Sequence, residues 1–150
     1  MGIIASGFLL LATALGPVHA QGGTVSATVR PNPLTVSVSA PDPVTVGQWF
    51  YIKAEVTNLG NQAITNTVVT INTPAGIIVR GQKKIKIGDL TGSQTQTVTW
   101  LAKANSSGTF IIQVEATGDL AGEQISSSDS LSISAVSSLA AFLFRLIFNV

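Results

Sequence analysis

Residues 47–61 alternate apolar and polar side chains with a period of two and then end in turn residues. Successive side chains of a β-strand point to opposite faces, so such a stretch has one apolar and one polar face. The apolar face carries Phe50, Ile52, Ala54 and Val56. A second sheet must cover these side chains, and the stretch therefore predicts a two-sheet, all-β sandwich.

Further segments of strand character follow, with turn residues between them. They are Ile64 to Asn72, Ile77 to Val79, Lys83 to Ile87, Gln94 to Ala104, Thr109 to Ala116 and Gln124 to Ala135. The phase within each segment predicts the rest of the core, namely Val98, Trp100, Ala102, Phe110, Ile112, Val114, Ala116, Ile125, Leu131 and Ile133. Leu101 and Ile111 are out of phase, which indicates either single exposed apolar residues or a nearby β-bulge.

The first 43 residues divide into two segments. Residues 1–20 resemble a signal peptide, because a short apolar run precedes Pro17 and small residues occupy positions 18 and 20, although no Lys or Arg lies at the start. Cleavage after Ala20 is expected, and retention as an anchor is the alternative. Residues 21–43 form a lead segment rich in Pro, Ser and Thr, in which prolines flank Leu34 to Ser39. That piece is expected to be an edge strand or an extended linker, and residues 44–136 the domain.

The low charge and the missing reactive residues limit the possible functions. Charged residues make up 10% of the chain against about 25% in an average domain. A net charge of +1 favours no nucleic-acid partner. The chain has no Cys, and its one His, His19, lies in the predicted signal peptide. Catalytic triads and zinc sites therefore lack their residues. We expect a non-enzymatic protein without cofactor, calcium on loop residues such as Asp89 and Asp119 being the weaker alternative.

Two groups of residues are candidate contact sites. Trp49 and Tyr51 share the polar face about 7 Å apart, a spacing suited to stacking on a sugar ring. The favoured interpretation, however, is that they cover the sheet end or contact the lead segment. Lys84 and Lys86 lie in a basic cluster with Arg80 and Lys83. The cluster could hold anionic glycans or lipid headgroups, but lysines that protect an edge strand from pairing are the favoured interpretation.

The tail, residues 137–150, is apolar and of helical character. Its aromatic residues are Phe142, Phe144 and Phe148. A helix from Leu139 onward would be about 18 Å long, too short for the roughly 30 Å hydrocarbon core of a bilayer. We therefore expect the tail to lie in a membrane interface or to dock on a partner. A truncated anchor and packing on the chain's own sandwich are the alternatives.

Several short motifs together resemble one known family. They are residues 46–61, Pro74 to Gly76, Ile87 to Leu90, Thr97 to Trp100 and Gly108 to Ala116. The pattern is similar to that of the CARDB domain, a cell-adhesion-related immunoglobulin-like (Ig-like) module of bacteria and archaea. The resemblance implies an Ig-like antiparallel sandwich of about seven strands with an adhesion or structural role at the cell surface.

The expected partners follow from these features. We expect an exported protein that is located at the cell surface or outside the cell and that could be attached to the membrane. Its expected partner is a surface glycan or another surface protein. Homo-oligomers could form by pairing of strand edges. Two other functions stay open: a carbohydrate-binding module that uses Trp49 and Tyr51, and an accessory subunit that docks on a membrane or complex through residues 137–150.

Overall fold

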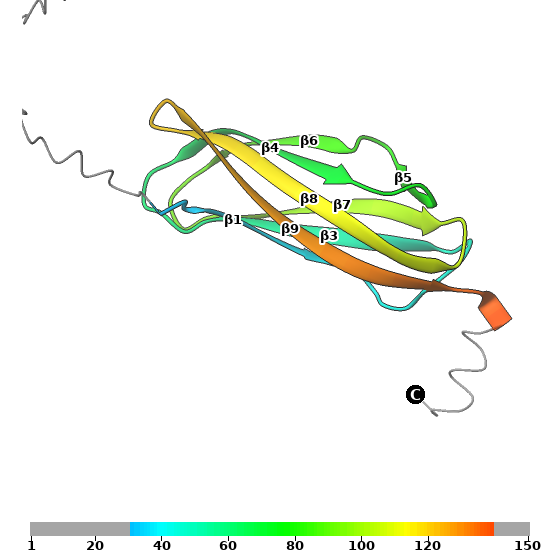
Figure 1. Cartoon of the computed structure of the whole chain (residues 1–150). Helices are drawn as coiled ribbons and strands as arrows, with labels where there is room; N and C mark the ends of the chain where they lie inside the picture. Colours follow the sequence, from blue (N-terminus) through cyan, green and yellow to red (C-terminus); the bar gives the residue numbers. More distant parts are fainter. Residues whose placement is uncertain (1–30, 140–150) are drawn as a thin grey trace, which may run out of the picture. The chain divides into compact units, whose positions relative to one another are not determined.

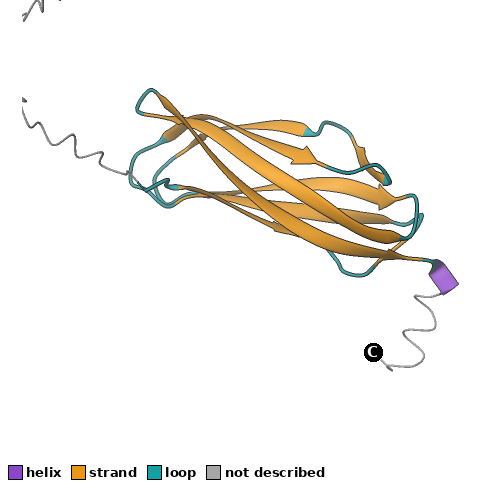
Figure 2. Ribbon diagram, in the orientation of Figure 1, coloured by secondary structure: helices purple, strands orange, loops and turns teal. Residues whose placement is uncertain are grey.

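The computed structural model describes residues 31–139, and most of these residues lie in β-strands (Figures 1 and 2). The predicted signal peptide and the tail residues Phe142, Phe144 and Phe148 lie outside the described residues. The strands are β1 (Leu34–Ser39), β2 (Val44–Thr45), β3 (Trp49–Asn58), β4 (Ile64–Asn72), β5 (Ile77–Arg80), β6 (Lys84–Leu90), β7 (Thr95–Ala104), β8 (Gly108–Leu120) and β9 (Glu123–Val136).

The strands form two sheets packed face to face (Figure 1). The four-stranded sheet has the order β1-β3-β7-β5 and the five-stranded sheet the order β2-β9-β8-β4-β6. All pairs are antiparallel except β2 with β9. The sandwich prediction is confirmed. About seven strands were expected, and the described residues contain nine, because β1 joins the sandwich and the two-residue β2 pairs with β9.

The core lies between the sheets where the period-two pattern places it. Ile52 of β3 is fully buried and pairs with Trp100 of β7, which is 2% exposed. Val98, Ile112, Val114 and the other predicted core residues are also buried, except that Phe110, Ile125 and Leu131 are only partly buried against the cluster. Burial of such a contiguous apolar cluster supplies most of the driving force for folding.

Two strands continue beyond the ends predicted from the sequence. The segment from Lys83 was expected to end at Ile87, but β6 continues to Leu90, which is fully buried. The segment from Thr109 was expected to end at Ala116, but β8 continues to Leu120. The β8–β9 turn is therefore only two residues, Ala121 and Gly122, both with positive φ, as tight hairpin turns require.

Strand β4 contains a β-bulge that the sequence did not reveal. Its register with β6 and β8 shifts between Ile64 and Val68, and Asn66 has a φ of 53°. The shift turns Thr67 into the core, where it is fully buried. No such shift occurs in the β8–β9 register beside Ile111, which is 66% exposed. Ile111 is therefore a single exposed apolar residue.

Side-chain hydrogen bonds link the two sheets along the edge of the sandwich where β1 and β9 are in contact. The carboxylate of Asp129 accepts a 2.8 Å hydrogen bond from the backbone N–H of Val38, and Asp42 accepts one of 2.7 Å from that of Ser134. The amide of Asn32 donates to the carbonyl oxygen of Ser126 at 2.6 Å. These bonds occupy backbone groups that an edge strand leaves open. The predicted edge strand at Leu34–Ser39 is confirmed, and it is an integral part of the four-stranded sheet.

Candidate functional site

The main candidate site lies on the outward face of the four-stranded sheet, near one end. Strand register places Trp49 beside Lys103 and Lys103 beside Ile78. In the next outward row Tyr51 pairs with Leu101, and Leu101 pairs with Arg80. Because paired residues of adjacent strands point to the same face, these six side chains form one group on β3, β7 and β5. We name it the aromatic patch: Trp49, Tyr51, Ile78, Arg80, Leu101 and Lys103.

The two aromatic residues of the patch are open to solvent. Trp49 is 45% and Tyr51 64% exposed. Strand β1 ends at Ser39, opposite Lys53, so the described part of the lead segment pairs beside neither aromatic residue and leaves both exposed. That the pair covers the sheet end or contacts the lead segment stays a prediction. The pair remains available for contact.

Lys103 and Trp49 of the patch form a cation–π contact. The ammonium nitrogen of Lys103 lies 5.0 Å from the centroid of the Trp49 ring. Such a cation–π contact stabilises an exposed pair by about 0.5–1 kcal/mol. The contact places a positive charge directly beside the exposed indole.

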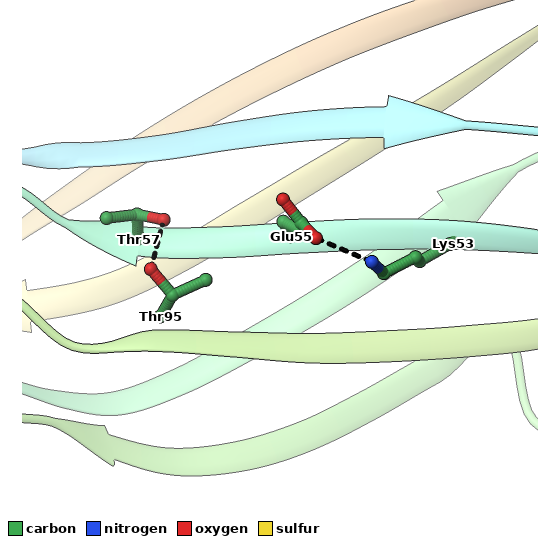
Figure 3. Close-up of polar contacts among 4 residues, drawn as sticks. All are labelled: Lys53, Glu55, Thr57 and Thr95. Atoms are coloured by element: carbon green, nitrogen blue, oxygen red, sulfur yellow. Dashed lines mark hydrogen bonds and ion pairs between the residues drawn. The ribbon is translucent and has the colours of Figure 1, made fainter.

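Beyond the patch, the outward positions of β1, β3 and β7 carry Ser and Thr side chains and the oppositely charged Lys53 and Glu55. Figure 3 shows four of the residues of this face. Lys53 and Glu55 form an ion pair of 2.6 Å with both side chains about half exposed. Farther along, the hydroxyls of Thr57 and Thr95 share a hydrogen bond of 2.8 Å. Glu55 is the carboxylate of this face, and Lys53 is its partner. The patch cations therefore have no carboxylate partner among the described residues of the sheet.

The structure separates the basic cluster of residues 80–86. Arg80 lies on β5 of the four-stranded sheet and joins the aromatic patch. Lys84 and Lys86 are exposed on β6, the outer strand of the other sheet, and Lys83 donates to the hydroxyl of Thr73 at 3.0 Å. The expected edge strand is confirmed. That its lysines obstruct pairing with another chain stays a prediction.

The two carboxylates considered for calcium were expected in loops, but Asp89 lies in β6 and Asp119 in β8, and both contact Asn66 at the β4 bulge. Asp89 accepts a hydrogen bond of 3.0 Å from the backbone N–H of Asn66, and Asp119 accepts one of 3.1 Å from the Asn66 side-chain amide. One asparagine thus supplies a donor to each carboxylate. Within residues 31–139 no group of three or more His, Cys, Asp or Glu residues is arranged to hold a metal ion. No helix in the same range has the length and apolar content needed to span a membrane.

Half of the patch was not expected from the sequence. No sequence pattern singles out Ile78 or Lys103, and Leu101 stands out only because it is out of phase. The signal was present in that phase: Leu101 and Lys103 share the outward face of their strand, opposite the core residues Trp100 and Ala102. Only the strand order, which the sequence does not reveal, brings them beside Trp49 and Tyr51.

Solved structures with the same architecture include a CARDB domain from Pyrococcus furiosus. Its solution structure matches with a TM-score of 0.51 and 20% sequence identity over 69% of this chain and 94% of that domain. The sandwich has the fold of a CARDB domain. A crystal structure of the P. furiosus domain was determined in complex with di-metal ions and matches with a TM-score of 0.50.

The CARDB-like sandwich also resembles Ig-like domains of larger proteins. Trypsin-activated α2-macroglobulin of Escherichia coli matches with a TM-score of 0.62 and 16% identity over 71% of this chain and 7% of that one. The GAE domain of GGA2p from Saccharomyces cerevisiae matches with a TM-score of 0.52 and 13% identity over 70% of this chain and 94% of that domain. No protein-family model and no curated protein sequence matches the chain. At these identities the likeness concerns the fold alone.

Proposed function

We propose that this Ig-like module is an exported, non-enzymatic protein with an adhesion or structural role at the cell surface. The observation that carries the proposal is the aromatic patch, which exposes Trp49 and Tyr51 on a flat sheet face. Exposed aromatic residues beside Arg are typical of contact surfaces, whereas catalytic groups are usually enclosed in a cleft. Export itself is proposed from the signal-peptide pattern of residues 1–20.

The carboxylates of the sandwich support a non-enzymatic role, because most are engaged in structural hydrogen bonds. Asp42 and Asp129 each bind a backbone N–H of a neighbouring strand, and Glu55 is paired with Lys53. Asp89 and Asp119 are held by Asn66. A hydrolytic carboxylate pair would instead have to flank a substrate site.

Surface labelling of intact cells tests this proposal. An epitope inserted between Ala121 and Gly122, in the tight β8–β9 turn, leaves the strands intact. We expect the epitope to be labelled and protease-sensitive on unbroken cells, and deletion of the chain to weaken cell–cell or cell–surface adhesion. The matched control is the same tagged chain with Leu11→Arg in the predicted signal peptide, which should be labelled only after lysis. Labelling of the unaltered tagged chain only after lysis would refute surface exposure.

A further inference from the structure

We propose that the aromatic patch docks this end of the sandwich onto an anionic lipid surface. The inference goes beyond the proposed function, since a surface module can act in adhesion without binding lipid. It rests on the composition of the patch, on its charge and on its place in the fold.

The patch combines the side-chain types that favour a membrane interface. Trp and Tyr are enriched at the headgroup level of bilayers, because their rings are apolar and their N–H or O–H groups are polar. Trp49 and Tyr51 are both exposed, and Ile78, on β5 across Lys103 from Trp49, is 44% exposed. Leu101 adds a half-buried aliphatic side chain between the aromatic residues and β5. Rings and aliphatic groups thus share one flat surface of three adjacent strands.

The charge of the patch is complementary to an anionic surface. Arg80 and Lys103 contribute two positive charges, and Glu55, on the same face, is held by Lys53. Asp89, Glu115 and Asp119 lie on strands of the opposite sheet. Basic side chains within a few ångströms of anionic headgroups are attracted to them, and this attraction weakens with salt.

The patch lies near the end of the sandwich at which β9 ends. The backbone N–H of Val46 binds the carbonyl oxygen of Val136, the last residue of β9, at 2.9 Å. The next residue, Gly47, binds the carbonyl oxygen of Ala104, which follows Lys103, at 2.9 Å. Trp49 and Lys103 are therefore within a few residues of the point where β9 ends. A tail at a membrane interface, as its sequence predicts, would bring this end of the sandwich to the lipid surface.

The cation on Trp49 favours lipid over sugar as the occupant. A sugar ring stacks on an open aromatic face, whereas the ammonium of Lys103 lies over the Trp49 ring at 5.0 Å. An anionic headgroup can bind that ammonium while the indole edge remains at the interface. Glycan binding is therefore an outcome that would contradict the proposal.

The experiment uses the full chain with vesicles of phosphatidylcholine, with or without phosphatidylglycerol, that carry doxyl-labelled lipid. Doxyl groups quench tryptophan emission only at short range. Trp49 is exposed and Trp100 is buried in the core, so the quenched emission should come from Trp49. We expect quenching on phosphatidylglycerol vesicles for the unaltered chain and little for Trp49→Phe, which retains Trp100 alone.

Paired charge variants separate the patch from general attraction. Arg80→Gln with Lys103→Gln should weaken vesicle binding about tenfold or more. Lys84→Gln with Lys86→Gln removes the same charge from the opposite sheet and should change binding much less. Equal losses in the two variants would overturn the proposal, as would vesicle binding without quenching of Trp49. Patch-dependent binding of a soluble acidic polysaccharide without vesicle binding would assign the patch to glycan instead. If the unaltered chain does not bind the vesicles although cells carrying it are surface-labelled, this inference alone is refuted.

Discussion

The side-chain amide nitrogen of Asn58 lies 3.0 Å from the carbonyl oxygen of Leu90 and donates a hydrogen bond to it inside the sandwich. The same nitrogen is 2.7 Å from the carbonyl oxygen of Gln62 and 3.2 Å from that of Thr91, while the Asn58 side-chain oxygen accepts from Gly60 N–H at 3.0 Å. Asn58 is fully buried. One side chain thereby joins the turn after β3 to the end of β6 in the other sheet.

Replacement of this asparagine should be costly. Asn58→Ala removes the donor from the buried carbonyl oxygen of Leu90 and from two partly buried carbonyl oxygens, and an unsatisfied buried group costs about 1–3 kcal/mol. We expect the free energy of unfolding to fall by about 2–4 kcal/mol in urea denaturation. Asn61→Ala, at an exposed position in the same turn, is the control and should change it by less than about 0.5 kcal/mol. Similar values for the two variants would mean that the buried bonds of Asn58 contribute nothing.

Two isoleucines allow the same substitution to be compared at a core position and at a solvent-exposed position. Ile52 is fully buried against the second sheet, whereas Ile111 is 66% exposed. Ile52→Ala should lower the free energy of unfolding by about 2–5 kcal/mol through lost burial and the remaining cavity. Ile111→Ala should change it by about 0.5 kcal/mol. A larger loss at Ile111 than at Ile52 would invert the assignment of inner and outer faces.

Gly118 and Ile64 should prove energetically coupled. A Cβ atom at Gly118 would lie 2.5 Å from Cγ2 of Ile64, so that Gly118→Ala must displace a core side chain. The expected cost is about 1–3 kcal/mol. In an Ile64→Ala background the same substitution should cost much less, and denaturation of the four chains of the double-mutant cycle measures the difference. Additive effects would show that the two side chains do not compete for space.

The strand faces could be predicted from the sequence because side-chain alternation is a local property. Ile52, Val98 and Trp100 all lie where their phase places them. The ends of β6 and β8 were less predictable, because glycine and aspartate favour turns in isolation. Gly118 nevertheless lies inside β8, since the β4 bulge leaves no room there for a side chain. That constraint comes from tertiary packing and has no local signal.

The candidate site was only half predictable for a similar reason. Trp49 and Tyr51 are close in sequence, so their common face follows from the period of one strand. Their contacts with Lys103 and Arg80 depend on the order β3-β7-β5, which joins strands distant in sequence. The pairing of Asp89 and Asp119 with Asn66 was hidden in the same way.

The lysines of β6 should keep the chain monomeric at that edge. Lys84 and Lys86 are exposed on an outer strand whose partner-free side could pair with another chain. Lys84→Val with Lys86→Val should cause concentration-dependent self-association in sedimentation velocity, because apolar β-branched residues favour edge pairing. The variant Lys84→Gln with Lys86→Gln removes the same charge, but glutamine has a lower β-strand propensity than valine, so this variant should self-associate less. An unchanged sedimentation coefficient for the Val pair at all concentrations would refute the protective role.

The measurement that most directly tests the account is acrylamide quenching of the two tryptophans, because the account places them on opposite faces of one sheet. Trp49 is 45% exposed and Trp100 is 2% exposed. The unaltered chain should contain a strongly quenched, red-shifted component that disappears in Trp49→Phe, leaving blue-shifted, weakly quenched emission from Trp100. If Trp49→Phe retains strongly quenched emission, Trp100 is exposed to water, and both the two-sheet core and the outward patch are contradicted.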